Sequence, residues 1–174
     1  WGAGTAFIYS LIQFVLGISN LAYCATLGAQ IGCVLLDYLL AFTVLGLADL
    51  FSKPFKSRAA GVCVGTAVVC LLRFVCSFLS GYIVWKDYDY AVEWLTNFEW
   101  GANFINSMGQ DALCWFYSFV YNLSYMLPET ILTVIGALIL YKAMPKLFAR
   151  QASQRVLSYA QTPPQRGEDA PCGQ

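Results

Sequence analysis

Two charged side chains, Asp37 and Arg73, interrupt stretches that are otherwise apolar enough to cross a lipid bilayer. A charge in hydrocarbon costs about 2.5 to 3.5 kcal/mol on insertion scales, so such residues usually face a partner, a cavity or a ligand. Aromatic residues flank both positions, with Tyr38 beside Asp37 and Phe74 beside Arg73. A carboxylate next to aromatic rings suits a flat cationic ligand, because the carboxylate supplies countercharge and the rings supply stacking and cation–π attraction. These residues predict a polar pocket inside a membrane protein.

The composition indicates an integral membrane protein. Hydrophobic residues make up 59% of the chain and charged residues 11%, whereas about 25% charged residues is typical of a soluble domain. The net charge of zero argues against a nucleic-acid partner, and the lack of histidine removes imidazole as a catalytic or metal-binding group. The seven cysteines form no CxxC pair and are predicted to pack as small apolar side chains. We therefore predict a protein that is not an enzyme, with no catalytic residues, no metal and no cofactor.

Four apolar segments approach or exceed the length of about 20 residues that crosses a bilayer. They are residues 3–17, 31–51, 59–85 and 111–148. The last is longer than one crossing requires, and Pro128 predicts a kink within it. The fold class predicted is an all-α, multi-pass integral membrane protein built as a helical bundle, with four transmembrane helices present. The chain begins inside an apolar run without a Met, so we expect it to lack its N-terminal part.

The charges in the connections predict an orientation. Basic residues cluster in the link 51–59 and after the last apolar segment, and the positive-inside rule places both, with the C-terminus, in the cytoplasm. The connection 86–111 carries one lysine against five acidic residues and is predicted to be an outer loop, as is 23–29. Residues 151–174 are rich in Gln, Ser, Pro and Gly and are predicted to form a disordered cytoplasmic tail after a transmembrane domain of residues 1–150.

Polar and aromatic residues from three segments fall at one predicted depth. They are Asp37 and Tyr38 of the second segment, Arg73, Ser77, Gly81 and Trp85 of the third, and Tyr117, Tyr121 and Asn122 of the last. The four residues of the third segment are spaced by four, so they share one face of a helix. All lie toward the outer ends of their helices by the orientation above. We therefore expect a pocket that opens to the outside.

Each of these residues also has a purely structural interpretation. Asp37 could pair with Arg73, or Arg73 with Glu129, as an ion pair within the bundle. Trp85 could anchor a helix end at the membrane interface. Asn122 could form an interhelical hydrogen bond. If all of these hold, the protein is a structural membrane subunit whose charges serve only helix assembly.

Three runs of sequence resemble the thiamine-specific S-component of energy-coupling factor (ECF) transporters. They are LLDYLLAFTVLGLADLF (35–51), LLRFVCSFLSGYIVW (71–85) and YSFVYNLSYMLPE (117–129), the last followed by YKAMPKLF (141–148). The resemblance covers about residues 1–148. It implies six transmembrane helices, four of them in this chain, and high-affinity binding of thiamine from outside the bacterial plasma membrane. It also implies docking on an energizing module of one transmembrane coupling protein and two ATPase subunits.

The resemblance also assigns ligand-binding roles. The family's site residues fall on Asp37, Tyr38, Arg73, Ser77, Gly81, Trp85, Tyr117 and Asn122, with Tyr23 as a further candidate. Members of the family commonly carry His where this chain has Ser77, which leaves open an S-component for a thiamine precursor or another vitamin such as riboflavin. The chain has no nucleotide-binding motif, so ATP hydrolysis is expected from the partner subunits.

Overall fold

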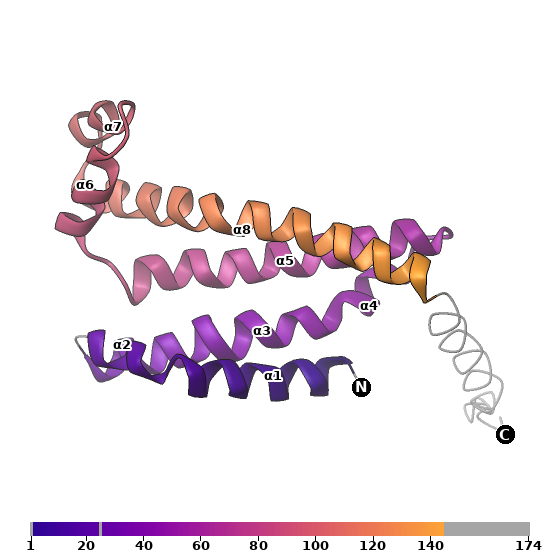
Figure 1. Ribbon diagram of the computed structural model, residues 1–174. Helices are drawn as coiled ribbons and strands as arrows, with labels where there is room; N and C mark the ends of the chain where they lie inside the picture. The colour runs from indigo at the N-terminus through magenta and orange to yellow at the C-terminus, as the bar shows by residue number, and fades with distance from the viewer. Residues whose placement is uncertain (1, 25, 145–174) are drawn as a thin grey trace, which may run out of the picture. The chain divides into compact units, whose positions relative to one another are not determined.

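The structure, a computed structural model, describes residues 2–24 and 26–144. The predicted tail 151–174 and the domain boundary at residue 150 lie outside the described residues. The described residues form helices joined by turns, with no strand among them (Figure 1). Those up to Leu138 belong to one compact unit, and the arrangement described below is that of this unit.

Three long helices account for most of the described residues. The elements in order are α1 (Gly2–Leu16), η1 (Ile18–Tyr23), α2 (Leu27–Cys33), η2 (Val34–Leu40), α3 (Ala41–Thr43), η3 (Val44–Leu47), α4 (Ala48–Ser52), α5 (Arg58–Ile83), α6 (Tyr88–Thr96), α7 (Gly101–Ser107) and α8 (Gln110–Ala143). The elements from α2 to α4 join into one continuous helix, Leu27–Ser52. This helix, α5 and α8 are long and apolar enough to cross a membrane, and α1 is a shorter apolar helix. The prediction of an all-α membrane protein is confirmed.

The second long helix begins earlier than the sequence predicts. Thr26 caps it, because its Oγ1 accepts a hydrogen bond from the backbone N–H of Ala29 at 3.1 Å. The predicted outer loop 23–29 is therefore wrong in its second half, where α2 has already begun. Hydropathy did not reveal this start, since α2 contains the polar Gln30 and two glycines.

The connection 86–111 is not the loop predicted from its charges, because it contains the helices α6 and α7. Asp87 caps α6 by accepting a hydrogen bond from the Tyr90 N–H at 2.9 Å. Ala91 and Leu95, one turn apart, are fully buried and form the inner face of α6. The helix α6 forms here because a cap and two apolar residues at helical spacing outweigh the acidic composition.

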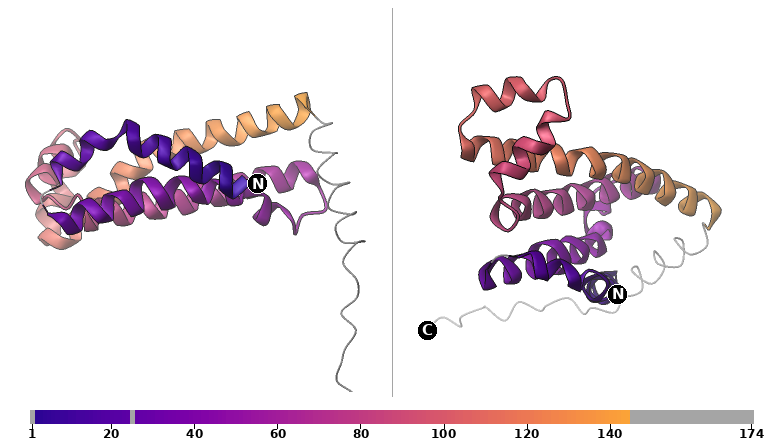
Figure 2. Two further views of the ribbon diagram at one scale, coloured as in Figure 1. Left: turned by 90° about the horizontal axis from the view of Figure 1, so that it is seen from below. Right: turned by 60° about the vertical axis from the view of Figure 1, so that its left-hand side comes forward.

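The long helices lie side by side. In Figures 1 and 2, α5 lies between α8 and the helix Leu27–Ser52. The helix α1 packs against η2, α3 and η3. Glycine allows α5 and the helix Leu27–Ser52 to approach closely, since a side chain at Gly65 would collide with the backbone carbonyl of Ala48. This packing sets the second and third predicted segments in direct contact.

The interior is built from small and polar side chains, while large apolar side chains point outward. Ser10, Ser80 and Ser118 are at most 1% exposed, whereas Leu16 is 74% and Leu132 68% exposed. In lipid, apolar side chains on the outer surface lose nothing by exposure, and small residues inside let helices pack closely. The pattern is that of a protein whose solvent is the bilayer.

The helix α8 is 34 residues long and continues through Pro128 without ending. At 1.5 Å per residue this is about 51 Å, longer than the roughly 30 Å hydrocarbon core. A kink at Pro128 stays a prediction. The segment predicted to end at 148 is helical as far as Ala143, and its last four residues lie outside the described part of the chain.

Candidate ligand-binding site

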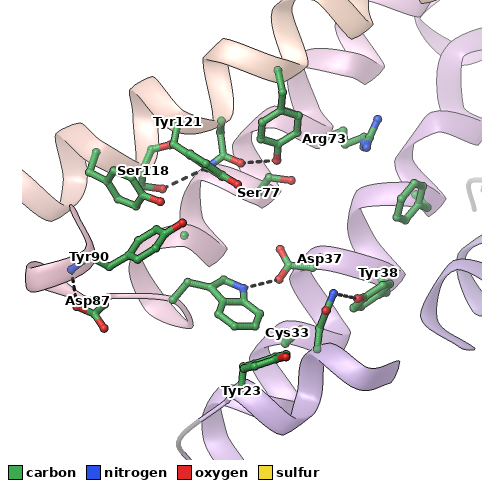
Figure 3. A pocket seen from close by; sticks show the side chains of 17 residues that line it. Tyr23, Cys33, Asp37, Tyr38, Arg73, Ser77, Asp87, Tyr90, Ser118 and Tyr121 are labelled. Carbon is green, nitrogen blue, oxygen red and sulfur yellow. Dashed lines mark hydrogen bonds between the residues drawn. The ribbon is translucent and has the colours of Figure 1, made fainter. Parts of the chain in front are cut away.

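A cavity of about 770 Å³ lies at the end of the bundle that carries α6 (Figure 3). It is lined by residues of the helix Leu27–Ser52, of α5, of α6 and of α8. Among them are all eight residues predicted to bind a ligand, Asp37, Tyr38, Arg73, Ser77, Gly81, Trp85, Tyr117 and Asn122. The volume falls in the range of about 300 to 1,000 Å³ found for small-molecule sites. The helical spacing therefore predicted which residues meet, and their role in binding stays a prediction.

The cavity wall contains an irregular helical turn. The segment η2, which carries Asp37, is a π-helix rather than an α-helix. Such a turn is wider by one residue than an α-helical turn, and short π segments are frequent at functional sites. Figure 3 shows Asp37 extending from this segment into the cavity. Hydropathy gives no signal for a π turn, so the sequence did not predict it.

Asp37 and Trp85 form the central contact of the cavity. The indole Nε1–H of Trp85 donates a hydrogen bond to Asp37 Oδ2 at 2.9 Å. This bond joins η2 to the residues just after α5 and fixes the indole against the carboxyl group. Asp37 takes part in neither the Arg73–Glu129 nor the Lys86–Asp111 ion pair. The structural interpretation in which Asp37 pairs with Arg73 is wrong, because Arg73 pairs with Glu129. The acidic group of Asp37 faces the cavity, and no cationic side chain pairs with it within residues 2–24 and 26–144.

Tyr38 also lines the cavity, but its hydroxyl group is engaged elsewhere. It donates a hydrogen bond to the Gly17 carbonyl oxygen at 3.0 Å and accepts one from Asn20 Nδ2 at 2.9 Å. The side chain is 8% exposed and packs edge-on against Phe14. Tyr38 therefore holds the turn between α1 and α2, and only its ring is available to the cavity.

Arg73 is paired with Glu129 of α8, as the alternative structural interpretation predicted. Its guanidinium group also lies over the ring of Phe42, 4.9 Å from the centroid. The Arg73 side chain is 18% exposed and that of Glu129 44%. The positive charge in this wall of the cavity is therefore compensated by a carboxylate and an aromatic face.

Hydrogen bonds connect α8 to α5 beside the cavity. Ser118 Oγ donates to the Phe78 carbonyl oxygen across the two helices at 2.7 Å. Asn122 Nδ2 donates to the Ser118 carbonyl oxygen at 2.8 Å, and the Tyr125 hydroxyl donates to Asn122 Oδ1 at 2.7 Å. A side chain at Gly81 would collide with Ser118, so glycine is needed there. These bonds of Asn122 stay within α8, and Ser118 makes the interhelical bond that was predicted for Asn122.

The helix α6 makes aromatic contacts with residues of the cavity wall. Trp94 packs against Tyr117 and Tyr121 of α8, with ring centroids 5.5 and 5.8 Å apart. Tyr90 packs edge-on against Tyr117 at 6.0 Å. Asp87 and Tyr90 line the cavity itself. The position of Tyr117 in the cavity wall is therefore fixed by contacts that the sequence did not predict.

Lys86, near the same end of the cavity, is paired with an acidic residue. Its amine forms an ion pair with Asp111. The hydrogen bond to Asp111 raises the pKa of Lys86, and the Tyr82 hydroxyl, 3.3 Å away, acts in the same direction. The positive charge of Lys86 is thus held at the first turn of α8 and is balanced there.

Several lining residues were missed as site residues. They are Asn20, Cys33, Phe42, Asp87, Tyr90, Ser118 and Tyr125. Two of them had a detectable signal, since Asp87 begins a capped helix and Tyr90 lies three residues later on it. Tyr125 and Ser118 lie one turn to either side of Asn122 and Tyr121, so helical spacing could also have found them. Tyr23 and Tyr121, which the sequence did suggest, line the cavity as well.

The helices and the cavity define a class of protein, an all-α integral membrane protein with a cavity of small-molecule size and polar, aromatic walls. The chain belongs to the thiamine transporter family, because the family model described as "Thiamine transporter protein (Thia_YuaJ)" matches residues 1–149. This is a family of transport proteins, in agreement with the prediction that the chain is not an enzyme.

Comparison with individual proteins gives one curated relative. The chain is 28% identical over 115 residues to "Thiamine transporter ThiT" of Bacillus subtilis (strain 168). The match covers 66% of this chain and 54% of the relative, so the chain spans about half the length of that protein. No solved structure matches the chain.

Proposed function

We propose that this protein binds thiamine in the cavity and takes it up across a bacterial plasma membrane as the S-component of an ECF-type transporter. The family match and the relative named as a thiamine transporter support thiamine as the ligand. The observation that carries the proposal is the Asp37 carboxyl group, which accepts a hydrogen bond from Trp85 and faces an aromatic cavity with no cationic partner in the described part of the chain.

The chemistry of the cavity suits thiamine. Its thiazolium ring is a flat cation, for which Asp37 offers countercharge and Trp85 a ring face. Its aminopyrimidine ring and hydroxyl group need hydrogen-bond partners, and Ser77 and the Asn122–Tyr125 pair provide polar atoms in the cavity wall. A ligand lacking one of these groups would leave a polar atom unpaired, at a cost of about 1 to 3 kcal/mol.

The transport step in this proposal depends on partner subunits. The cavity lies beside α6. The charges of the connections favour an outward-facing position for this end of the bundle and a cytoplasmic C-terminus. The chain has no nucleotide-binding motif, so a transmembrane coupling protein and two ATPase subunits would supply the energy. The chain itself would need no cofactor, because thiamine is its cargo.

One observation favours a second ligand. Ser77 is a small side chain in the cavity wall, and the cavity volume of about 770 Å³ is in the upper part of the range of small-molecule sites. A thiamine precursor or another vitamin such as riboflavin would therefore be the alternative ligand of an S-component. If instead the protein were a structural subunit, its charged residues would only join helices, as the Arg73–Glu129 pair joins α5 to α8, and no small molecule would bind.

The test is a titration of the full-length protein in detergent with thiamine, in which tryptophan fluorescence and calorimetry measure binding. We expect saturable quenching by thiamine that is lost in the variant Asp37→Asn. A response to the pyrimidine precursor or to riboflavin, with none to thiamine, would retain the cavity and change its ligand. A protein that responds to none of the three would contradict the proposal and favour a structural subunit.

A further inference from the structure

The helix α6 is a packed cover at the end of the cavity. Ala91 and Leu95 are fully buried, and the Trp94 ring contacts both Tyr117 and Tyr121 of α8. A helix held by buried apolar side chains and by ring contacts keeps a defined position. Side chains on its cavity face are therefore placed reproducibly against a bound ligand.

Two side chains of this region, Asp87 and Tyr90, line the cavity. Figure 3 shows Tyr90 extending toward the open space that Asp37 enters from the opposite side. Asp87 Oδ1 caps α6 by accepting the Tyr90 N–H bond at 2.9 Å, so the two residues form one unit. The second carboxylate oxygen of Asp87 is not used by this cap. The unit thus offers a ring and a hydrogen-bond acceptor.

The charge at this end of the cavity is negative. Asp87 lines the cavity, and Asp89 and Glu93 follow on the same helix. The nearest cation in the sequence, Lys86, is balanced by Asp111. A phosphate monoester carries a charge of about −1.5 to −2 at neutral pH. Such a group would be repelled here, whereas a neutral alcohol can donate a hydrogen bond to a carboxylate.

We propose that Asp87 and Tyr90 form an outer subsite that holds the neutral hydroxyethyl end of thiamine and rejects its phosphate esters. This inference rests on the proposed function, since it assumes that thiamine occupies the cavity. Tyr90 packs on the ligand beside the alcohol, and Asp87 accepts the hydrogen bond of the alcohol. The cavity then contacts the ligand at two places. Asp37 binds the cationic ring, and Asp87 binds the uncharged hydroxyethyl end.

The experiment compares the affinities of thiamine and thiamine monophosphate by calorimetry in the full-length protein. In Asp87→Asn we expect the preference for thiamine to fall about threefold to tenfold, as for removal of one unit charge near a partly hydrated phosphate. Asparagine still caps a helix, so α6 is retained. The matched control is Asp89→Asn, which removes the same charge from the same helix outside the cavity lining and should change the preference less than about twofold.

Substitution of Tyr90 tests the other half of the subsite. We expect Tyr90→Ala to weaken the binding of both ligands about fivefold, and Tyr90→Phe to retain most of the affinity, because the ring makes the contact. The inference is overturned if wild-type protein binds thiamine while Asp87→Asn leaves the preference unchanged, or if Asp89→Asn lowers it equally. If wild-type protein binds no thiamine, the proposed function fails first and this subsite fails with it.

Discussion

Asp37 and Arg73 are both charged residues in apolar helices, and both line the same cavity, yet the structure uses their charges differently. Arg73 is compensated by Glu129 and lies over the ring of Phe42. Asp37 accepts a hydrogen bond from the neutral indole of Trp85 and has no cationic partner among the described residues. The charge in the cavity wall at Arg73 is therefore compensated by the protein, whereas the carboxylate at Asp37 could bind a cationic ligand.

The comparison shows that a charge in a membrane helix does not by itself identify a binding residue. The cost of placing a charge in hydrocarbon can be met by a protein partner, as at Arg73, or by a ligand, as we propose at Asp37. The two cases predict different consequences of substitution. Loss of Arg73 should affect folding more than binding, and loss of Asp37 should affect binding more than folding.

The largest effect is expected from removing the charge of Asp37. In Asp37→Asn the affinity for thiamine should fall about 30- to 150-fold, which corresponds to about 2 to 3 kcal/mol for loss of a desolvated charge partner. Unfolding by denaturing detergent should change little, because asparagine retains an oxygen that can accept the Trp85 hydrogen bond. Calorimetry and circular dichroism measure the two quantities. Equal loss of affinity and stability would break the comparison.

The next effect concerns Trp85, which contacts Asp37 directly. We expect Trp85→Ala to weaken binding about fivefold to 30-fold, because a ring face and the donor to Asp37 are both lost. Trp85→Phe keeps a ring and removes only the donor, so its affinity should lie between those of wild type and Trp85→Ala. Calorimetric titration with thiamine separates the three proteins. If Trp85→Phe were as weak as Trp85→Ala, the hydrogen bond rather than the ring would determine affinity.

Substitution of the ion pair should give the opposite pattern. Arg73→Gln or Glu129→Gln should lower the free energy of unfolding by about 1 to 2 kcal/mol, between the values typical of exposed and buried pairs. The affinity for thiamine should fall less than in Asp37→Asn. The exchanged pair Arg73→Glu with Glu129→Arg should recover part of the stability. A large loss of affinity in Arg73→Gln with unchanged stability would instead make Arg73 a ligand-binding residue.

The smallest effect is expected at Cys70, which is buried on the same helix as Arg73 but does not line the cavity. Cys70→Ala should leave the affinity for thiamine within about twofold of wild type, because the thiol is small and lies outside the cavity lining. The same calorimetric titration serves as the measurement. A loss comparable to that in Trp85→Ala would mean that general disturbance of α5, rather than ligand contact, governs affinity.

The sequence was most informative where hydrophobicity and helical spacing act together. The apolar segments were predicted with their ends within a few residues, apart from the end at residue 148, which lies outside the described residues. The prediction worked because the bilayer requires a minimum length of apolar helix. The spacing of Arg73, Ser77, Gly81 and Trp85 placed them on one face, and the structure brings that face to the cavity. Such predictions depend only on local geometry, which the sequence contains.

Features that depend on partners were not predictable in the same way. The sequence allowed Arg73 to pair with Asp37 or with Glu129, and only the packing of α8 against α5 decides between them. The hydrogen bonds of the Tyr38 hydroxyl depend on how η1 folds back toward η2. The helix α6 was missed because its acidic composition is typical of a loop. The positions of Asp87, Ala91 and Leu95 nevertheless fit a capped amphipathic helix.

The π turn at η2 has a consequence for how related sequences are aligned. A π turn holds one more residue than an α turn while the helix continues, so the residues on either side of η2 are offset by about 100° relative to a regular helix. A relative that lacks one residue in this region would keep an equally apolar segment but rotate one side of it against the other. An alignment gap within Val34–Leu40 would therefore mark a change in which residues face the cavity, even where every neighbouring letter matches.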